Sequence, residues 1–557
     1  MKLNFKHYLN FNSDGYEIIT QSSLINHDSG GEYVSWTFRK APGFFDVVTY
    51  SGTGSAQNIS HSLGSVPGMI IIHCRDGTHD WEVYHRATGA TKSLHLNKTD
   101  AEATDSTVWN NTTPTSSVFT IGTSSNVNQN GHGYVAYVFA HDEQAFGTDE
   151  DEAIIKCGSY TGTGSANNFV NVGFEPQFLL TKSAGGNDPW SIVDVMRGMS
   201  IGSDMSVLRP NYNSAEYTDN TTYPTSTGFN ITNTGGLNND NGRTYIYMAI
   251  RRSHKSPTAG TEVFAMDTGS SSSTTPTWDS GFTVDMSFVV HPNSGSMNNM
   301  SSARLLGRKL LYTNNTDAEA ANSSFTWDSN VGWGKDYNNN AYSYMYRRAP
   351  GFLDVVAYTG TGSNGQAVNH NLGVTPEMII VKSRSGNGNW FTYHTGLSSG
   401  NHIKLNQDYA QSNDGGAAFA LTSTTITFDR TYVSNINTNT VTYVAYLFAT
   451  LDGISKVGSY TGTGANYGNS VNVDCGFTAG ARFVMIKRID SGGDWYFWDT
   501  LHGIVSGNDP YSLINSYAAQ VTNTDYIDPL NAGFTVTSSA PAALNTSGGT
   551  YLFLAIA

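Results

Sequence analysis

A repeat of about 100 residues constrains the fold of this 557-residue chain more than any other feature. The string at residues 50–55, Tyr-Ser-Gly-Thr-Gly-Ser, returns with small changes at 160–165, 358–363 and 460–465. A period this long gives each repeat enough residues for its own two-layer core, whereas solenoid repeats of roughly 20–50 residues share one core. The sequence therefore predicts separate domains that follow one another along the chain.

Each copy contains the same series of strand-like segments. The first copy has an opening segment at Phe45–Tyr50, a segment after a proline at Met69–Ile72, a tryptophan at Trp81 and an aromatic closing segment at Tyr134–Ala140. β-Branched and aromatic residues dominate these segments, Gly, Asn, Ser and Thr separate them, and helical periodicity is lacking. We therefore expect an all-β fold of tandem, jelly-roll-like β-sandwich domains with almost no helix.

The repeats are of three types, which we name A, B and C. Residues 41–48 match residues 349–356, so the order of types is itself repeated. The C type lacks the Gly string and has no tryptophan at the usual place. The predicted units are a partial C unit at 1–40, A1 at 41–142, B1 at 153–252, C at 256–348, A2 at 349–450 and B2 at 454–557. Short connections between them predict a fairly stiff rod rather than loosely tethered domains.

Residues 1–40 are predicted to be the C-terminal half of a C unit. Tyr33–Lys40 precedes A1 as Tyr342–Arg348 precedes A2, and Lys2–Phe5 and Tyr8–Phe11 correspond to Arg308–Tyr312. Half a sandwich leaves a core face and strand edges open. We therefore expect either that the chain is a piece of a longer protein, the favoured alternative, or that another chain supplies the missing strands by donor-strand complementation.

Composition excludes several classes of protein. The charge of −15 argues against a nucleic-acid groove and against binding to anionic membranes. No apolar run is long enough for membrane insertion, and the N-terminus has no secretory signal pattern. The three cysteines, Cys74, Cys157 and Cys475, are far apart, so buried thiols are expected rather than a disulfide framework or a zinc knuckle.

A tryptophan followed by a polar residue recurs in four units and forms the candidate ligand-binding set. The candidates are Trp81 with His85, Trp190 with Asp194, Trp390 with His394, and Trp495 with Asp499. An indole can stack on the C–H face of a sugar while an imidazole or carboxylate binds its hydroxyls. The alternative interpretation is core packing, and the recurrence in four units favours it, because a shared core repeats more reliably than a site.

The remaining patterns give weaker indications of a binding or catalytic site. The Gly strings lack the features of a phosphate loop and indicate turns or bulges. Asp/Asn/Gly turns precede each tryptophan and could hold Ca²⁺, although simple hairpin turns are favoured. His61, His73, His79, His85 and His95 lie in A1, where a metal site is the weaker interpretation. With no catalytic motif, we predict a protein that is not an enzyme, with no catalytic residue, cofactor or metal ligand assigned.

The two B units and the start of A1 carry a specific repeat signature. Its matching residues are Lys156–Ser165, Trp190, Asp194, Gly228–Thr232 and Tyr245–Ile250 in B1, Lys456–Ala465, Trp495, Asp499, Gly533–Thr537 and Gly548–Ala557 in B2, and 41–55 in A1. This signature resembles a repeat domain of tail-fibre and other virion structural proteins of marine tailed bacteriophages, notably those of cyanobacteria. The resemblance covers nearly the whole chain and is weakest over 256–348.

The resemblance implies a virion structural protein, a tail fibre or tail appendage that contributes to recognition of host cell-surface polysaccharide. We expect other virion proteins as partners and a homo-oligomer, most simply a trimer. The expected location is the virion, after assembly in a host cytoplasm that suits the few cysteines. The alternatives are a capsid-decorating protein or an extracellular adhesin, and, further off, a virion-associated polysaccharide hydrolase.

Overall fold

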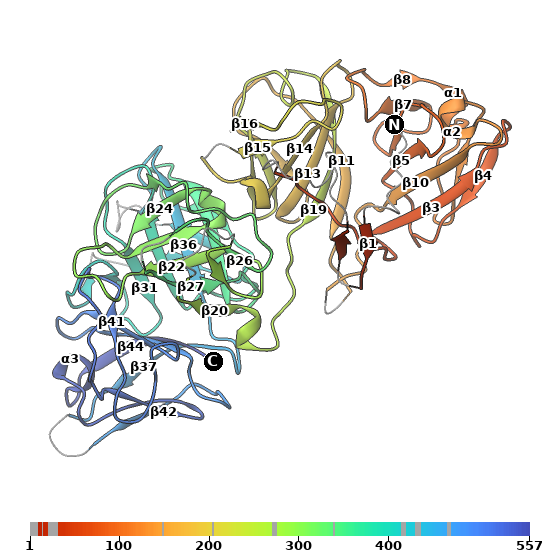
Figure 1. Cartoon of the computed structure of the whole chain (residues 1–557). Helices are drawn as coiled ribbons and strands as arrows, with labels where there is room; N and C mark the ends of the chain where they lie inside the picture. Colours follow the sequence, from red (N-terminus) through yellow and green to blue (C-terminus); the bar gives the residue numbers. More distant parts are fainter. Residues whose placement is uncertain are drawn as a thin grey trace. The chain divides into compact units, whose positions relative to one another are not determined.

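The computed structural model is an all-β protein, with 4% of residues in helix and 40% in strands, as predicted (Figure 1). The structure describes residues 9–13, 15–19, 32–147, 150–202, 205–269, 276–337, 340–413, 419–428, 436–464 and 469–557. These form two compact modules, and each is treated by itself below. The N-terminal module comprises Met1–Val193, Val207–Tyr217 and Gly228–Arg252, and the C-terminal module comprises Asp194–Ser206, Thr218–Thr227 and Ser253–Ala557.

A1 is a β-sandwich with a larger and a smaller antiparallel sheet. The larger sheet has the order β3 (Phe45–Ser51), β10 (Gly133–Phe139), β5 (Met69–Cys74), β6 (Glu82–His85), β7 (Lys92–His95) and β8 (Ala103–Thr104). The smaller sheet pairs β4 (Gln57–Ser60) with β9 (Val118–Ile121), and two single-turn helices, α1 (Ser106–Trp109) and α2 (Ser125–Asn128), flank it in sequence. The closing strand β10 and the strand β6 after the tryptophan lie inside the larger sheet.

B1 repeats this plan. Its larger sheet has the order β11 (Ile155–Thr161), β19 (Thr244–Arg251), β13 (Pro176–Ser183) and β14 (Ser191–Asp194), and β12 (Asn168–Asn171) pairs with β18 (Gly228–Ile231). Shorter elements are η2 (Val195–Arg197), β15 (Met205–Val207), β16 (Tyr217–Asp219) and β17 (Thr222–Thr225). Ahead of A1, β1 (Leu9–Phe11) pairs with β2 (Tyr16–Ile18).

The C-terminal module contains C, A2 and B2. C has a larger sheet of β20 (Phe264–Asp267), β27 (Tyr342–Tyr346), β22 (Met286–Val290), β23 (Met300–Ala303), β24 (Lys309–Tyr312) and β25 (Ala320–Ala321), a pair of β21 (Trp278–Asp279) and β26 (Gly332–Trp333), and the single turns η3 (Gly260–Glu262) and η4 (Arg304–Leu306).

A2 and B2 have the same two-sheet plan. A2 has β28 (Leu353–Thr359), β36 (Thr442–Phe448), β30 (Met378–Ser383), β31 (Phe391–His394), β32 (Asn401–Lys404) and β33 (Ser412–Asn413) opposite β29 (Gln366–Asn369), β35 (Thr425–Phe428) and β34 (Phe419–Leu421). B2 has β37 (Ser455–Thr461), β44 (Thr550–Ile556), β39 (Phe483–Arg488), β40 (Trp495–Asp499) and β41 (Ser512–Leu513) opposite β38 (Val471–Asp474), β43 (Gly533–Val536) and β42 (Ile527–Leu530), with α3 (Ala542–Asn545).

The larger sheets of the C-terminal module are buried on both faces, and this explains why their central strands are apolar almost without interruption. In β36, Ala445 and Leu447 pack inside the A2 sandwich, whereas Val444, Tyr446 and Phe448 belong to a different core. Successive side chains of a strand point to opposite faces, so one strand serves two cores.

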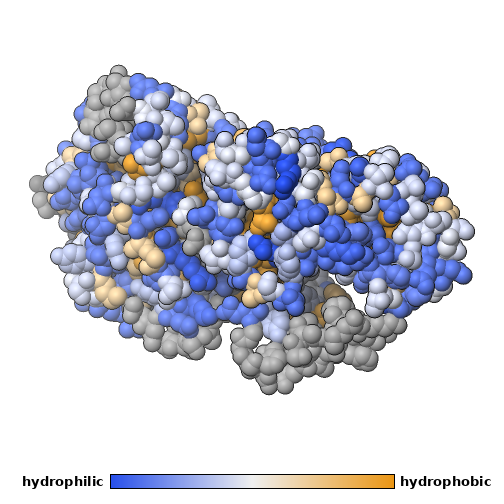
Figure 2. Space-filling view, turned by 90° about the horizontal axis from the view of Figure 1, so that it is seen from above, coloured by the Kyte–Doolittle hydropathy of each residue, from blue (hydrophilic) through white to orange (hydrophobic). Residues whose placement is uncertain are grey.

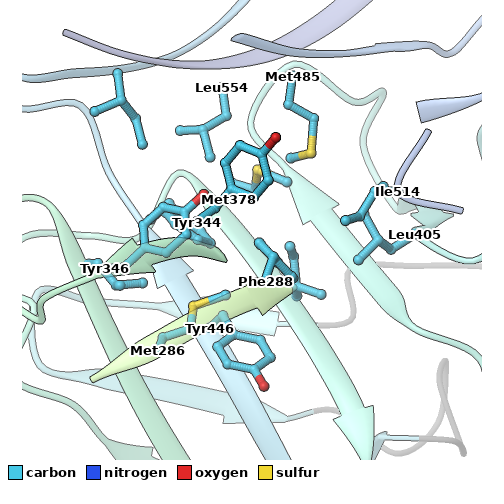
Figure 3. Close-up of a cluster of buried hydrophobic side chains, with 14 of the residues drawn as sticks. Met286, Phe288, Tyr344, Tyr346, Met378, Leu405, Tyr446, Met485, Ile514 and Leu554 are labelled. Carbon is cyan, nitrogen blue, oxygen red and sulfur yellow. The ribbon is translucent and has the colours of Figure 1, made fainter. Parts of the chain in front are cut away.

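That second core is shared by all three sandwiches of the C-terminal module. Side chains from C, A2 and B2 converge there, including Tyr344, Tyr446 and Leu554 at equivalent positions of the three closing strands (Figure 3). The predicted rod of sandwiches in series is therefore wrong for this module. The three sheets instead surround one core, because each has an apolar outer face that must be removed from water.

The Gly strings form close-packed turns, as predicted. A Cβ atom on Gly52 would lie 2.1 Å from the carbonyl oxygen of Gln129, and the equivalent Gly162, Gly360 and Gly462 are equally restricted. Only glycine fits such an approach of two backbones. In the predicted partial C unit, Leu9–Phe11 forms the strand β1, whereas Tyr33–Lys40 forms no strand. The prediction for Lys2–Phe5 lies outside the described residues.

Candidate functional site

The recurrent tryptophans hold neighbouring sandwiches together. Each indole Nε1–H donates to the backbone carbonyl of the residue that ends an outer strand in the preceding unit. The pairs are Trp190 to His95 at 2.8 Å, Trp390 to Tyr312 at 2.8 Å and Trp495 to Lys404 at 3.0 Å. All three side chains are buried, with at most 2% of their surface exposed. Each indole is buried and its single N–H donor is hydrogen-bonded, so its burial leaves no polar group unsatisfied. Such an indole forms a stable joint between two sandwiches.

A lysine repeats beside each of these tryptophans. These lysines are not among the site residues predicted from the sequence. The Nζ donations to the preceding unit are Lys182 to Thr99 O at 3.1 Å, Lys382 to Thr316 O at 3.2 Å and Asp317 O at 2.7 Å, and Lys487 to Asp408 O at 3.0 Å. Burial lowers the pKa of each lysine to about 8. A lysine at the same place in three apolar strands was the available signal, since lysine is rarely buried without partners.

A histidine repeats at the A–B joints. His85 Nε2 lies 3.2 Å from the carbonyl oxygen of Tyr247, and His394 Nε2 lies 3.4 Å from that of Phe553. In both rings Nδ1 accepts a backbone N–H, so Nε2 carries the proton and donates it to the neighbouring sandwich. Burial lowers the pKa of each imidazole to about 4, and the neutral form is the one that the joint holds.

The two aspartates of the candidate set are also buried. Asp499 Oδ2 accepts the hydroxyl of Tyr344 in the C unit at 2.7 Å and lies 2.7 Å from Nδ1 of His502. The carboxylate of Asp194 accepts the backbone N–H of Arg197 at 2.9 Å and pairs with its guanidinium at 2.8 Å. Asp499 thus joins B2 to C, and Asp194 caps a short turn.

The sugar-stacking prediction is therefore not supported for seven of the eight candidates. The buried seven are His85, Trp190, Asp194, Trp390, His394, Trp495 and Asp499. Their faces and polar atoms contact protein, so no sugar ring reaches them, and the core-packing interpretation describes them. Trp81 alone is half-buried, and it stacks on His73 with ring centroids 4.1 Å apart.

The C unit has Asn299 where the other units have the tryptophan. Its Nδ2 donates to the carbonyl oxygens of Leu513 and Ser516 in B2, each at 2.9 Å. Thr313 adds a hydroxyl bond to Ile514 O at 2.7 Å. C therefore contacts B2 through the same position by which A2 contacts C and B2 contacts A2. With these three contacts, the sandwiches form a closed ring.

The other candidate metal ligands separate into two groups. Asp80, Asp188 and Asp490, in the turns before the tryptophans, pair with Lys98, Arg243 and Arg488 at 2.7–3.0 Å, which favours hairpin turns over Ca²⁺ sites. His61 lies near Thr115 O, and His95 lies 3.2 Å from Glu82, whose hydrogen bond raises the pKa of that imidazole. His79 differs, because it lies beside Cys74 and His132. All three cysteines are free and buried, as predicted.

One small cavity of the C-terminal module lies inside the shared core, lined by Phe288, Tyr344, Phe483, Met485, Phe497 and Ile514. This largely apolar lining offers little to orient a polar substrate. The visible outer surface is mostly hydrophilic, with small scattered apolar patches (Figure 2). Within the described residues, no helix has the length and hydropathy needed to cross a bilayer.

Comparison with known proteins identifies the family. The model of a family described as "Domain of unknown function (DUF7483)" matches residues 2–254 and 346–557. These stretches cover more than half of the chain, which therefore belongs to this family. Each contains one A–B pair, and most of the C unit lies between them. Searches of the curated proteins and of the solved structures gave no match.

Proposed function

We propose that this DUF7483 protein is a non-enzymatic structural component of a phage virion, a tail fibre or tail appendage that contributes to recognition of a host-surface glycan. The observation that carries the proposal is that the side chains repeated most faithfully connect one sandwich to the next. Tryptophan, lysine and histidine recur at fixed places and connect sandwich to sandwich. A repeat that preserves its joints is suited to building a rigid appendage.

The repeat signature supports the virion part of this proposal. Its resemblance to repeat domains of tailed-phage fibre proteins covers A and B units alike. A surface that is polar but weakly charged, with charged residues at only 13% of the chain, presents many hydroxyl and amide groups for adaptable hydrogen bonding. Three thiols, all buried, suit assembly in a reducing cytoplasm.

Glycan contact is assigned to exposed loop aromatics rather than to the buried tryptophans. Tyr212, Tyr409 and Tyr517 are 47%, 66% and 55% exposed, and they lie in the loops that follow β15, β32 and β41. A tyrosine ring held on a scaffold can stack on a sugar while its hydroxyl binds a polar group.

The virion location is tested with antibodies against the full chain, applied to intact tailed-phage particles and viewed by electron microscopy. Labelling of a tail fibre or tail appendage is expected. Labelling of the capsid alone, or of cells in the absence of particles, would replace the proposal with the capsid-decorating or adhesin alternative.

Glycan binding is tested with the purified chain and polysaccharide isolated from the surface of the host. Tyr409→Ala and Tyr517→Ala are expected to weaken binding about tenfold or more each, and Tyr358→Phe in the A2 core serves as the matched control. Unchanged binding by the loop variants would remove these tyrosines from the site. Depolymerisation of the polysaccharide by the wild-type chain would make it a hydrolase and overturn the non-enzymatic assignment.

A further inference from the structure

Four metal-ligating side chains meet at one end of A1. Cys74 ends β5, Asp76 and His79 follow in the next loop, and His132 directly precedes β10. One ligand atom each of Cys74, His79 and His132 lies within 4.8 Å of the others. Asp76 Oδ1 lies 3.4 Å from the Cys74 sulfur and 3.0 Å from His132 Nδ1. Three donors thus surround one point, and Asp76, which contacts two of them, lies next to it.

The backbone around the cluster brings the donors together. Cys74 pairs with Tyr134 across β5 and β10, which sets His132 beside the thiol. A Cβ atom on Gly77 would lie 2.9 Å from His79 Nε2 and 3.1 Å from the Cys74 sulfur. Glycine at this position therefore leaves the space in which imidazole and thiol approach each other.

The other units show that this cluster is not part of the repeated framework. At the four corresponding positions A2 has Ser383, Ser385, Gly388 and Val441. B1 has Asp188 and Arg243 at the places of His79 and His132, and the two form an ion pair at 2.7 Å. A1 departs from A2 at four positions that are separated in sequence but adjacent in space, and each departure introduces a metal ligand.

We propose that Cys74, Asp76, His79 and His132 bind one Zn²⁺ ion. One thiolate, two imidazoles and one carboxylate make a four-coordinate set of the kind zinc prefers, and the soft sulfur disfavours Ca²⁺ and Mg²⁺. The thiol, which now donates to Asp76, loses its proton to solvent on binding, and the two negative ligands then balance the ion. Affinity therefore rises with pH.

The test uses the full chain, purified without chelator, and measures its metal content and its absorption after Co²⁺ loading. We expect about one zinc per chain and a thiolate-to-cobalt charge-transfer band. His132→Val, which introduces the residue of A2, is expected to weaken zinc binding about 10-fold or more, and Cys74→Ser to abolish the thiolate band. Cys475→Ser, at a buried thiol elsewhere, is the matched control and keeps both signals.

Two results would overturn the zinc site. The first is no stoichiometric metal in the wild-type chain at micromolar free Zn²⁺. The second is equal metal content in the wild type, Cys74→Ser and His132→Val. The thermal unfolding transition of each variant is measured as well, so that loss of metal is not confused with unfolding.

A second inference concerns the half-buried face of A1 and rests on different observations. A2 has the same sheet, and its outer face is sealed by the C unit and B2: Val444 and Tyr446 have no exposed surface. The equivalent Val135 and Tyr137 of A1 remain partly exposed. In the described part of the N-terminal module, one wall of the corresponding core is missing.

The joint positions on this face have no receiving carbonyl among the described residues. Trp81 occupies the place of Trp390, and His73 occupies that of the buried Lys382. Trp81 is half-buried and stacks on His73, whose Nδ1 is buried without a hydrogen-bond partner. In the C-terminal module, the acceptors for these two positions come from the C unit.

The segment Tyr33–Lys40 already lies where a C unit has its closing strand. Trp36 contacts Phe178 with ring centroids at 6.1 Å, as Tyr344 contacts Phe483 at 5.7 Å. Lys40 pairs with Asp46 at 2.6 Å, the counterpart of the pair between Arg348 and Asp354 at 3.4 Å. The closing segment is thus docked on A1 and B1, and no strand flanks it among the described residues.

We infer that this face binds a C-type sandwich that lacks its closing strand, with Tyr33–Lys40 completing the sheet. The C unit of a second copy does not fit, because β27 already closes its sheet and both its neighbours are in place. The partner is therefore a further C-type domain. It supplies carbonyl acceptors to Trp81 and His73 and an apolar face to Trp36 and Tyr137.

The test grafts residues 256–341, the C unit without its closing strand, directly before Tyr33 of the otherwise intact chain. Hydrogen exchange in β5 and β6 is expected to slow about tenfold or more, and acrylamide quenching of Trp81 to fall. The same graft with Leu311→Asp, which places a charge in the apolar face, is the control and protects neither strand.

Unchanged exchange in β5 and β6, whether the graft fails to fold or fails to dock, would overturn this inference. So would protection of Trp81 in the unmodified chain that rises with protein concentration, since a second copy would then be the occupant. Quenching that Trp81→Phe does not remove would show that the face is already covered.

Discussion

The two modules are built from the same parts but differ in how many interfaces they close. Both contain an A–B pair with the same tryptophan and histidine bonds. Among the described residues, a C unit is found in the C-terminal module alone, where it adds two interfaces and turns a pair into a ring. The family model matches each A–B pair and little of the C unit. The comparison indicates that the A–B pair is the basic unit and that C seals its open face.

The largest expected difference between the modules comes from equivalent tryptophans. Trp390→Ala removes a fully buried indole from the shared core and leaves the carbonyl of Tyr312 without its hydrogen-bond donor. We therefore expect the free energy of unfolding to fall by about 3–5 kcal/mol. Trp81→Ala removes a half-buried ring and is expected to cost at most about 1 kcal/mol. Denaturant unfolding with hydrogen exchange assigned to each module measures both.

Equal losses for the two variants would mean that the face of A1 is closed, and they would contradict the comparison. Trp495→Ala, at the A2–B2 joint, serves as the positive control for a buried joint tryptophan.

Acid should weaken the A–B joints of both modules alike. The folded-state pKa of His85 and His394, about 4, lies below the ordinary value of 6.5, so the unfolded chain binds more protons between those values. The stability of each joint is complete above pH 6.5 and falls as pH decreases towards 4, by up to about 3 kcal/mol per histidine. Thermal unfolding between pH 7 and 4 measures the loss.

His394→Gln sharpens this prediction, because glutamine keeps a donor without titrating in this range. The A2–B2 joint should become less acid-sensitive while the A1–B1 joint keeps its response. A pH profile unchanged by His394→Gln would assign the acid sensitivity to other groups.

Weakening the contact between C and B2, which closes the ring, should affect the C-terminal module alone. Asn299→Ala leaves the carbonyls of Leu513 and Ser516 without their donor, and we expect a loss of about 1–3 kcal/mol. Hydrogen exchange should quicken in β23 and β41 and stay unchanged in A1. Faster exchange throughout the N-terminal module would contradict independent modules.

The smallest effect is expected at the polar contact between C and A2. Ser301 donates its hydroxyl to Tyr446 at 3.0 Å inside the shared core. Ser301→Ala should cost about 1 kcal/mol, because only one neutral hydrogen bond is lost and the tyrosine ring stays packed. A loss as large as that of Trp390→Ala, measured by the same denaturant unfolding, would show that this bond positions the whole interface.

Short-range patterns determined the sandwich and its turns. The apolar strand at Met378–Val381 and the aromatic strand at Thr442–Phe448 follow from residue type and spacing, and Gly360 marks a turn because a side chain there would collide with backbone. These features depend on neighbours within a few residues and on steric limits that hold in any fold.

The sequence by itself thus determined the all-β repeat and the place of each tryptophan, and left open whether Trp390 and its counterparts bind a ligand or pack. Only the tertiary structure decided this, because a strand that is apolar on both faces can bury its second face against a sugar, a membrane or a neighbour with equal local chemistry. The neighbour that supplies the carbonyl of Tyr312 lies 78 residues away from Trp390. The same applies to Cys74 and His132, 58 residues apart, which strand pairing alone brings together.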